Sequence, residues 1–377
     1  MSQILPFFRT HPYLVSIISF TIGYFFMPVV IEVARKYNFV VSPNKRTSHK
    51  GDVPNIGGIN IFVSFLFTVF LFSYNVFSEI QFSILGLFII LIVGFIDDLI
   101  DIKASWKVIG ELIAAFFLII LADLRISNFH GFLGIYELPL FFSYAISFFV
   151  FIVIVNSLNL IDGVDGLASG LGILYSLFFA VYFLFTGHLD LSVTSFAMLG
   201  SLVVFFYYNV FSNKRKIFMG DSGSLLLGYM INLFVFSFLE MNAKHDIPPQ
   251  FLIKAAPAVA ISLLIVPLFD TVRVMITRMK KGYSPFRADK NHVHHLLLSL
   301  GLKHRDVSLI LMGITVGFII VGLIFRNIPN GVLVAIDFVF CLILTKYLWI
   351  LVDRKNITKT NEQLVELKQK KDLTDKP

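Results

Sequence analysis

The stretch LFFSYAISFFVFIVIVNSLNLIDGVDG at residues 140–166 decides the fold class. Its first part, 140–158, is almost entirely apolar and long enough to cross a bilayer as a helix, which takes roughly 20 apolar residues. It then runs directly into amide and carboxylate side chains and into glycines, which permit tight turns and the close approach of a ligand. The stretch therefore predicts a membrane span that delivers polar groups to one membrane surface.

Apolar runs of similar length recur along the whole chain, which is 57% hydrophobic with a mean hydropathy of +0.82. Soluble domains are far more polar, so these runs are interpreted as membrane spans. We predict an all-α polytopic membrane protein with about eleven transmembrane helices, at 12–35, 56–75, 80–98, 105–123, 140–158, 166–186, 189–209, 222–240, 251–277, 306–326 and 330–352. Residues 1–352 would form a single transmembrane catalytic bundle, and 353–377 a polar cytoplasmic tail.

The distribution of lysine and arginine predicts the orientation, because cytoplasmic loops carry an excess of both. With the N-terminus outside, the outer side holds only five of the 31, namely Arg9, Arg125, Lys244, Lys254 and Arg326. An odd number of spans then places the C-terminus in the cytoplasm. The net charge of +7 reflects this bias and not nucleic-acid binding, and it favours anionic lipid headgroups and phosphorylated substrates.

Five polar loops fall between the predicted spans so that all of them share one face of the membrane. They are NKRTSHKGDVPNIGG from Asn44, DDLID from Asp97, NLIDGVDG from Asn159, FMGDSGS from Phe218 and ADKNHVHH from Ala288. Loops separated by an even number of spans lie on the same side of a threaded bundle. Carboxylates, histidines and lysines gathered on one face indicate a site for a charged, water-soluble substrate.

The acidic loop holds three carboxylates within five residues, Asp97, Asp98 and Asp101. Like charges this close repel one another, so the arrangement favours a nearby cation, a basic partner or a proton to be taken. In a continuing helix Asp97 and Asp101 would share a face, at spacing i, i+4. A solvated helix end, with Asp101 paired to Lys103, is the alternative interpretation.

Two further motifs offer oxygen ligands. Asn159, Asp162 and Asp165 could bind a metal or a sugar, although Asp-Gly pairs are also ordinary turn dipeptides. Asp221 and Ser222 precede a span, where either could cap the helix. A helix N-terminus also suits phosphate, but a carboxylate there would repel it without an intervening Mg²⁺, which takes one or two carboxylates plus substrate phosphates. Asp221 is therefore a candidate Mg²⁺ ligand.

Basic loops complete the predicted site. The loop 278–305 holds Arg287 and the group His292, His294 and His295, which would suit a pyrophosphate. Zinc is the alternative for these histidines, but the single cysteine, Cys341, and the lack of an HExxH pattern argue against it. Lys50, in the SHKG core of the first loop, would contact phosphate, although a positively charged inner loop explains the segment equally well.

Taken together, the five motifs resemble the polyprenyl-phosphate N-acetylhexosamine-1-phosphate transferase family (glycosyltransferase 4 family), over about residues 44–295. The acidic pair of that family falls on Asp97 and Asp98, its NxxDGxDGLA element on Asn159, Asp162 and Asp165, and its FMGDxGS element on Phe218–Ser224. A nucleotide-contacting asparagine of the family matches Asn209. The run His292-Val293-His294-His295, in place of three consecutive histidines, resembles the GlcNAc-1-phosphate branch and departs from the phospho-MurNAc-pentapeptide transferases.

The resemblance implies transfer of an N-acetylhexosamine-1-phosphate from a UDP-sugar, UDP-GlcNAc in this branch, to polyprenyl phosphate at the bacterial inner membrane, with release of UMP. Mg²⁺, or Mn²⁺ as the alternative, would bind Asp221 and Asn159. Asp97 or Asp98 would orient or deprotonate the lipid phosphate. The substrates would be held by Lys50, Asp162, Asp165, Asn209, Phe218, Arg287, His292, His294 and His295. Partners would be membrane lipid and no nucleic acid, with a homodimer left open.

A transporter is the rival class, because carboxylates inside a membrane commonly mark ion or proton paths. Transporter sites tend to lie near the bilayer midplane. Here the acidic residues cluster at one end of the predicted spans, with Glu111 and Asp337 as the main exceptions. For these two, hydrogen bonding between helices is the expected role.

Overall fold

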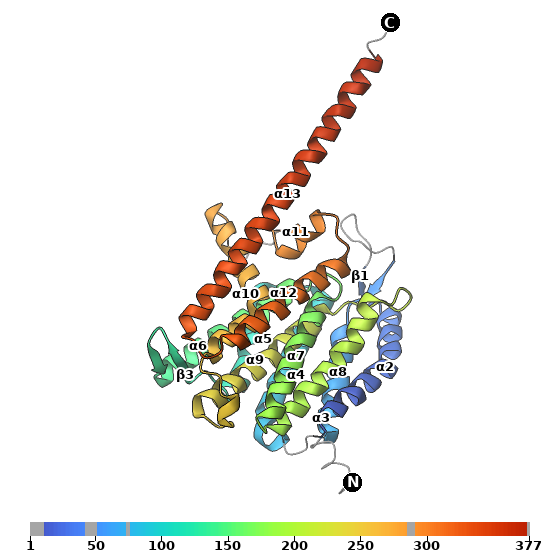
Figure 1. The fold of residues 1–377 in the computed structure, drawn as a ribbon. Coiled ribbons are helices and arrows are strands. Elements are labelled where there is room, and N and C mark those ends of the chain that lie inside the picture. Colours follow the sequence, from blue (N-terminus) through green and yellow to red (C-terminus); the bar gives the residue numbers. More distant parts are fainter. Residues whose placement is uncertain (1–10, 42–50, 73–75, 285–290, 375–377) are drawn as a thin grey trace.

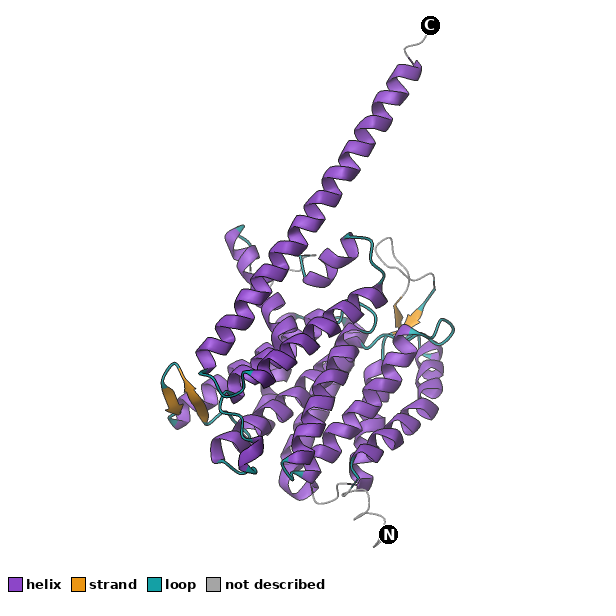
Figure 2. Ribbon diagram, in the orientation of Figure 1, coloured by secondary structure: helices purple, strands orange, loops and turns teal. Residues whose placement is uncertain are grey.

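The computed structural model describes the chain except for residues 1–10, 42–50, 73–75, 285–290 and 375–377. Helices make up nearly all of the ordered structure, and two short antiparallel hairpins lie at opposite ends of the bundle (Figure 2). The predicted all-α class is confirmed. The chain is a multi-pass membrane protein by the length and apolar composition of its helices.

The described helices follow one another along the chain. In chain order they are α2 (Tyr13–Lys36), α3 (Gly57–Phe72), α4 (Val76–Ile100), α5 (Ala104–Phe116), the π-helix η1 (Phe117–Leu121), α6 (Leu140–Ile161), α7 (Leu167–Phe185), α8 (Leu189–Val210), α9 (Gly220–Lys244), the 3-10 helix η2 (Pro249–Phe251), α10 (Ala256–Lys280), α11 (Val293–Ser299), α12 (His304–Ile324) and α13 (Asn330–Thr374). The strands β1 (Val40–Val41) and β2 (Val53–Pro54) form one hairpin, and β3 (Asn128–Phe132) and β4 (Ile135–Glu137) the other.

Each of the eleven predicted spans coincides with a helix. Within the described residues, ten helices are long and apolar enough to cross a membrane, and η1 extends α5 to the required length. The exception in length is α3, an apolar helix of 16 residues where a span at 56–75 is predicted. The predicted division at residue 353 falls inside α13, which continues without a break to Thr374.

Helix α9 lies at the centre of the bundle, and every residue of its apolar, membrane-length part is buried. It packs against α3, α4 and α6. Small residues allow this close approach, since a Cβ added to Gly94 of α4 would lie 2.5 Å from Ser222 Cα, and one on Gly58 of α3 would lie 2.3 Å from the Gly223 nitrogen. The N-terminus of α9 is therefore held rigidly between two other spans.

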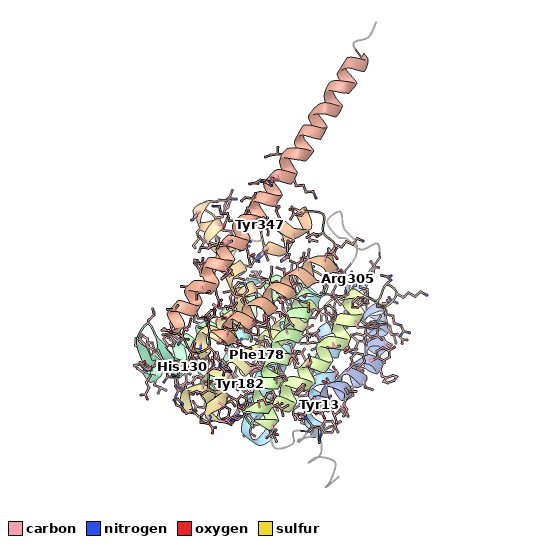
Figure 3. All side chains as sticks on the ribbon, in the orientation of Figure 1. Tyr13, His130, Phe178, Tyr182, Arg305 and Tyr347 are labelled. Atoms are coloured by element: carbon pink, nitrogen blue, oxygen red, sulfur yellow. The ribbon has the colours of Figure 1, made fainter. Side chains whose placement is uncertain are left out.

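The two ends of the bundle differ in character (Figure 1). One end carries β1–β2, α11 and the start of α12, and we call it the site end; the other carries β3–β4. Arg305 and Tyr347 lie toward the site end, and His130 and Tyr182 toward the other (Figure 3). Helix α2 begins at the end of the bundle opposite the site end, and α13 projects beyond the site end.

The two intramembrane acids link helices, as expected. Glu111 Oε2 of α5 accepts a hydrogen bond of 2.6 Å from Asn156 Nδ2 of α6. Asp337 Oδ2 of α13 accepts one of 2.5 Å from Ser262 Oγ of α10. Hydrogen bonds of this kind between spans stabilise helix association where no water competes.

Candidate active site

The site begins at the N-terminus of α9, which a side chain from α4 caps. Gly220 takes a φ of +72°, and a Cβ there would lie 2.5 Å from Asp98 Oδ2. Asp98 Oδ1 accepts from the Asp221 backbone nitrogen at 2.7 Å, and Oδ2 from that of Ser222 at 3.0 Å. The prediction that Asp221 or Ser222 caps its own helix is therefore wrong. A carboxylate on the positive end of the helix dipole is favourable and fixes α9 against α4.

Asp98 also accepts a hydrogen bond of 3.1 Å from Asn55 Nδ2. Its two oxygens thus receive three hydrogen bonds from the protein. A carboxylate engaged in this way holds neighbouring groups in place. The geometry therefore gives Asp98 a positioning role, and it leaves Asp97 as the member of the acidic pair that contacts a charged group.

Asp97 is held by the turn that ends α4. Its Oδ1 accepts from the Ile102 backbone nitrogen at 2.9 Å, and its Oδ2 lies 2.9 Å from Lys107 Nζ. The expectation that Asp97 shares a helical face with Asp101 is wrong, because α4 ends at Ile100 and Asp101 takes a φ of +50°. In the described chain, Asp101 forms no ion pair with Lys103, which is exposed.

Lys107 is the centre of the cluster, and sequence reasoning did not single it out. From the first turns of α5 it contacts Asp97, Asp221 Oδ1 and, at 3.4 Å, Asn159 Oδ1. Asn159 Nδ2 donates to Asp221 Oδ1 at 2.6 Å and to Ser224 Oγ at 2.8 Å. Side chains from three other helices, α4, α6 and α9, thus converge on one half-buried lysine of α5. Its ammonium group neutralises two carboxylates that would otherwise repel each other.

The loop between α6 and α7 holds its two carboxylates differently. Asp165 Oδ2 lies 2.7 Å from Lys216 Nζ and 3.3 Å from His304 Nδ1. Burial would raise the pKa of Asp165, but the hydrogen bonds from His304 and Lys216 outweigh it and hold this pKa below its usual range. Desolvation and the charges of Asp221, Asp98 and Asp165 raise the pKa of Asp162 well above its usual range.

A cavity of about 670 Å³ opens beside these groups, within the range of small-molecule sites. Seven of the predicted site residues line it, namely Asn159, Asp162, Asp165, Asn209, Phe218, Asp221 and His295. Asn55 and His304, which the sequence did not single out, line it too. Asp97 and Asp98 do not line the cavity themselves. Asp97 contacts Lys107, and Asp98 contacts the start of α9, where the lining residue Asp221 lies. Carboxylates, amides and imidazoles thus share the lining of this cavity, which we call the polar cavity.

The three histidines predicted to bind substrate do not act alike. His292 Nδ1 lies 2.9 Å from Asp270 Oδ2, and the ring is buried. His294 is also buried, and burial followed by the nearby His295 lowers its pKa to about 3, so it is neutral at physiological pH. Only His295 lines the cavity. Asp270 also forms an ion pair of 2.7 Å with Arg273 of the same helix.

Asn209 and Phe218 contribute mainly to the shape of the cavity. Asn209 Oδ1 accepts from the Gly166 nitrogen at 2.6 Å, and its Nδ2 donates to the Ile217 carbonyl at 2.8 Å. The amide therefore ties the loop after α6 to the loop before α9. The Phe218 ring lies 5.4 Å from Lys216 Nζ, a cation–π contact beside the cavity. The predicted contacts of Lys50 and Arg287 lie outside the described residues.

The oxygen donors at the cavity suit Mg²⁺. Among the described residues, no three His, Cys, Asp or Glu side chains are grouped so as to hold a metal by themselves. Mg²⁺ does not need such a cage, because it usually binds one or two carboxylates together with substrate phosphates and water. A cationic group already bridges Asp97 and Asp221 in the form of the Lys107 ammonium, while the described chain offers the Asp162 carboxylate no hydrogen-bond donor. Asp221, Asn159 and Asp162 therefore fit a divalent cation that arrives with phosphate.

Three basic residues at the site were missed from the sequence, Lys107, Lys216 and His304. Lys107 carried one usable signal, since a lone lysine one turn into an apolar span must find an acidic partner. Lys216 and His304 looked like the flanking charges of ordinary inner loops. Their partner, Asp165, lies 51 and 139 residues away, and no local pattern indicates a contact over such separations.

Comparisons with known proteins identify the family of the chain. The model of a family described as Glycosyl transferase family 4 matches residues 80–238. A protein of Bacillus subtilis (strain 168), named "Probable undecaprenyl-phosphate N-acetylglucosaminyl 1-phosphate transferase", is 32% identical over 296 residues, 78% of each chain.

Two further relatives are named "Undecaprenyl-phosphate alpha-N-acetylglucosaminyl 1-phosphate transferase". The Escherichia coli (strain K12) protein is 28% identical over 302 residues, 79% of each chain. The Yersinia pestis protein is 27% identical over 329 residues, 86% of this chain and 87% of its own. The segment 80–238 that the family model matches contains Asp97, Asp98, Lys107, Asn159 and Asp221, so the whole cluster around Lys107 lies within it.

Proposed function

Since the chain belongs to glycosyl transferase family 4, as its motifs predicted, we propose that it transfers GlcNAc-1-phosphate from UDP-GlcNAc to undecaprenyl phosphate and releases UMP. The observation that carries the proposal is the cluster of Asp97, Lys107, Asn159 and Asp221 at the start of the central helix, opening on a polar cavity of about 670 Å³. The reaction initiates synthesis of a cell-envelope polysaccharide. The names of the relatives support the same substrates.

The chemistry is phosphoryl transfer. An oxygen of undecaprenyl phosphate forms a bond to the sugar-bearing phosphorus of UDP-GlcNAc, and the bond from that phosphorus to UMP breaks, with the electron pair leaving on UMP. Catalysis of such a step depends on positioning and on neutralising charge. In this proposal Lys107 neutralises charge on the reacting phosphates, and Asp97 keeps its ammonium group in place. Asp98 holds the N-terminus of α9, and hence Asp221, in position.

Mg²⁺ is the proposed cofactor, held by Asp221 with Asn159 and Asp162, and Mn²⁺ is the alternative. When bound, the ion would neutralise pyrophosphate charge and act as a Lewis acid on the phosphoryl oxygens. Asp221→Asn tests this assignment. It should leave the fold intact, because Asp98 and not Asp221 caps α9. It should raise the Mg²⁺ concentration required for half-maximal activity, whereas unchanged Mg²⁺ dependence would remove Asp221 from the metal site.

The nucleotide-sugar would occupy the cavity. His295, His304 and Lys216 would donate hydrogen bonds to the pyrophosphate, and Asp165 keeps the latter two in place. Lys50 and Arg287 stay proposed phosphate contacts. For His292 and His294 we propose an indirect role, in which their buried rings fix α11 so that His295 faces the substrate.

The protein would lie in the bacterial inner membrane, with the site end facing the cytoplasm, where nucleotide-sugars are made. The support is the lysine and arginine distribution along the sequence. A homodimer stays an open proposal. The phospho-MurNAc-pentapeptide alternative is disfavoured by the HVHH pattern at residues 292–295. The transporter alternative is disfavoured because Glu111 and Asp337 are engaged in bonds between helices.

The direct test is UMP release by purified full-length protein in detergent. It should require undecaprenyl phosphate, UDP-GlcNAc and a divalent cation together, and omission of any one should abolish turnover. Turnover with UDP-MurNAc-pentapeptide but not with UDP-GlcNAc would assign the other branch of the family. No UMP from any UDP-sugar in a panel would contradict the proposed activity.

A further inference from the structure

Helix α11 is a thin wall between two cavities. His295 and Leu298 line the polar cavity of the active site. Val293 and Leu297, on the other face of the same short helix, line a second cavity of about 380 Å³. The alternation follows from helical geometry, since residues four apart share a face. A molecule bound in the second cavity would therefore contact α11, the helix that also lines the active site.

The second cavity is apolar and lies within the membrane-spanning region. Its walls come from α10, α12 and α13, which are all candidate spans. Its interior residues, such as Leu311 and Phe318, are buried, whereas Ile310, Leu344 and Tyr347 at its rim are exposed by 39%, 40% and 61%. Tyr347 lies on the part of α13 near α11 (Figure 3). The cavity is thus reached from the side, through the lipid-facing gap between α12 and α13.

One polar corner distinguishes this cavity from a plain packing defect. Arg273 lines it, and its side chain is only 12% exposed. Within the described chain, the guanidinium donates from Nη2 alone, to Asp270 and to the Asn291 carbonyl. A guanidinium group carries five N–H donors, so Nε and Nη1 have capacity left for an anion. Lys303, next to the lining residue Leu302, and Lys355, bonded to the Ser299 carbonyl, add positive charge nearby.

We propose that the second cavity binds an acyl chain of an anionic phospholipid, with the lipid phosphate at Arg273, and that the bound chain holds α11 in place. An apolar chain and an anionic head match the two parts of the cavity, and a phospholipid of the adjoining leaflet supplies both. The occupant is not the reacting polyprenyl phosphate, because α11 separates Arg273 from the carboxylates around Lys107. A lipid chain in this cavity would keep its phosphate on the wrong side of that wall.

Contacts connect the two cavities residue by residue. Asp270, which lines the second cavity, holds His292 at 2.9 Å. The His292 ring stacks on His294, with centroids 5.6 Å apart and planes 9° apart, and His294 contacts His295 at 4.3 Å. His295 faces the polar cavity. The effect on substrate binding rests on the proposed function, but lipid binding and the order of α11 do not.

The binding test uses native mass spectrometry of full-length protein taken from bilayers of phosphatidylglycerol or phosphatidylcholine. One tightly retained phosphatidylglycerol per chain is expected, about tenfold over phosphatidylcholine. Both lipids offer a phosphate to Arg273, but the choline ammonium group would lie beside the positive charges of Arg273, Lys303 and Lys355. Ile314→Trp fills the cavity and should abolish retention. Ile320→Trp, on the same helix but exposed to lipid, is the matched control and should retain it. Ile310→Trp at the rim is the second variant if Ile314→Trp fails to fold.

The conformational test is amide hydrogen exchange of residues 293–299. Phosphatidylglycerol should slow this exchange in the wild type and in Ile320→Trp, but not in Ile314→Trp. Equal retention of the two phospholipids, or full retention in both cavity-filling variants, would overturn the site. Displacement of phosphatidylglycerol by undecaprenyl phosphate, one for one, would make the acceptor the occupant and overturn the assignment. None of these results depends on turnover, so they stand apart from the test of the proposed activity.

Discussion

The acidic cluster at the start of α9 and the histidine cluster of α11 both stem from dense polar motifs, yet they are built in opposite ways. Asp97, Asn159 and Asp221 converge on one lysine beside the cavity. Of the three histidines, two turn into the protein, where His292 is bound to Asp270 and His294 is buried. The first cluster presents polar groups beside the cavity, whereas two of the three histidines of the second cluster are buried and fix the position of α11.

The largest effect is expected at Lys107. Lys107→Met removes the only cation that the described residues place between Asp97 and Asp221. We expect kcat to fall by about 10²–10³, the usual cost of losing one electrostatic contact in a transition state. The measurement is steady-state UMP release. Lys103→Met, at an exposed lysine on the same turn, is the control and should stay within about twofold of wild type. A Lys107 variant as active as this control would remove the lysine from the mechanism.

Substitutions of Asp97 and Asp98 should differ in their effects on stability. Asp97→Asn should lower kcat by about 10²-fold, because Lys107 loses one of its two carboxylate partners. Thermal stability should change little, since Asp221 still pairs with the lysine. Asp98→Asn should lower kcat and also destabilise the protein by about 1–3 kcal/mol, since it disturbs the hydrogen bonds that cap α9. Asp101→Asn is the control, because Asp101 is exposed and asparagine tolerates its positive φ. Equal activity in the three variants would reduce the segment to a solvated helix end.

Substitutions of the histidines should differ in their effects, according to whether the side chain faces the cavity or is buried. His295→Ala should lower kcat/KM for the nucleotide-sugar by about tenfold, the value of one charged hydrogen bond, and leave the melting temperature unchanged. His292→Ala should lower the melting temperature and affect kcat/KM less, because it breaks the buried contact with Asp270. The reverse order of effects on kcat/KM would mean that α11 is turned differently when substrate is bound.

The smallest predicted effect is on the pH dependence of stability. His294 has its pKa lowered to about 3, while an unfolded histidine titrates near 6.5. Between these values the unfolded chain binds more protons, so stability falls as pH is lowered from about 6.5. His294→Gln should remove on the order of 1 kcal/mol of the loss between pH 7 and pH 5, as measured by thermal unfolding in detergent at both values. An unchanged loss would place His294 in a solvated setting.

The sequence predicted the bundle well and the site in part, for reasons that particular residues illustrate. A run such as 140–158 has only one stable arrangement in a membrane, so each predicted span coincides with a helix. Asn159 and Asp221 were predicted to lie together and do so. Sequence reasoning did not predict that Asp98 caps α9 or that Lys107 pairs with Asp97 and Asp221. Helical periodicity predicts which side of its own helix a residue occupies, but it does not predict which residue of another helix it contacts.

The central claim is that a sugar-1-phosphate, and not the sugar alone, moves to the lipid. The most direct measurement uses UDP-GlcNAc carrying labelled phosphorus at either the α or the β position, with undecaprenyl phosphate as acceptor. The account predicts that β label appears in the lipid product and α label in released UMP, in equal amounts. Release of UDP, with neither label in the lipid, would contradict it.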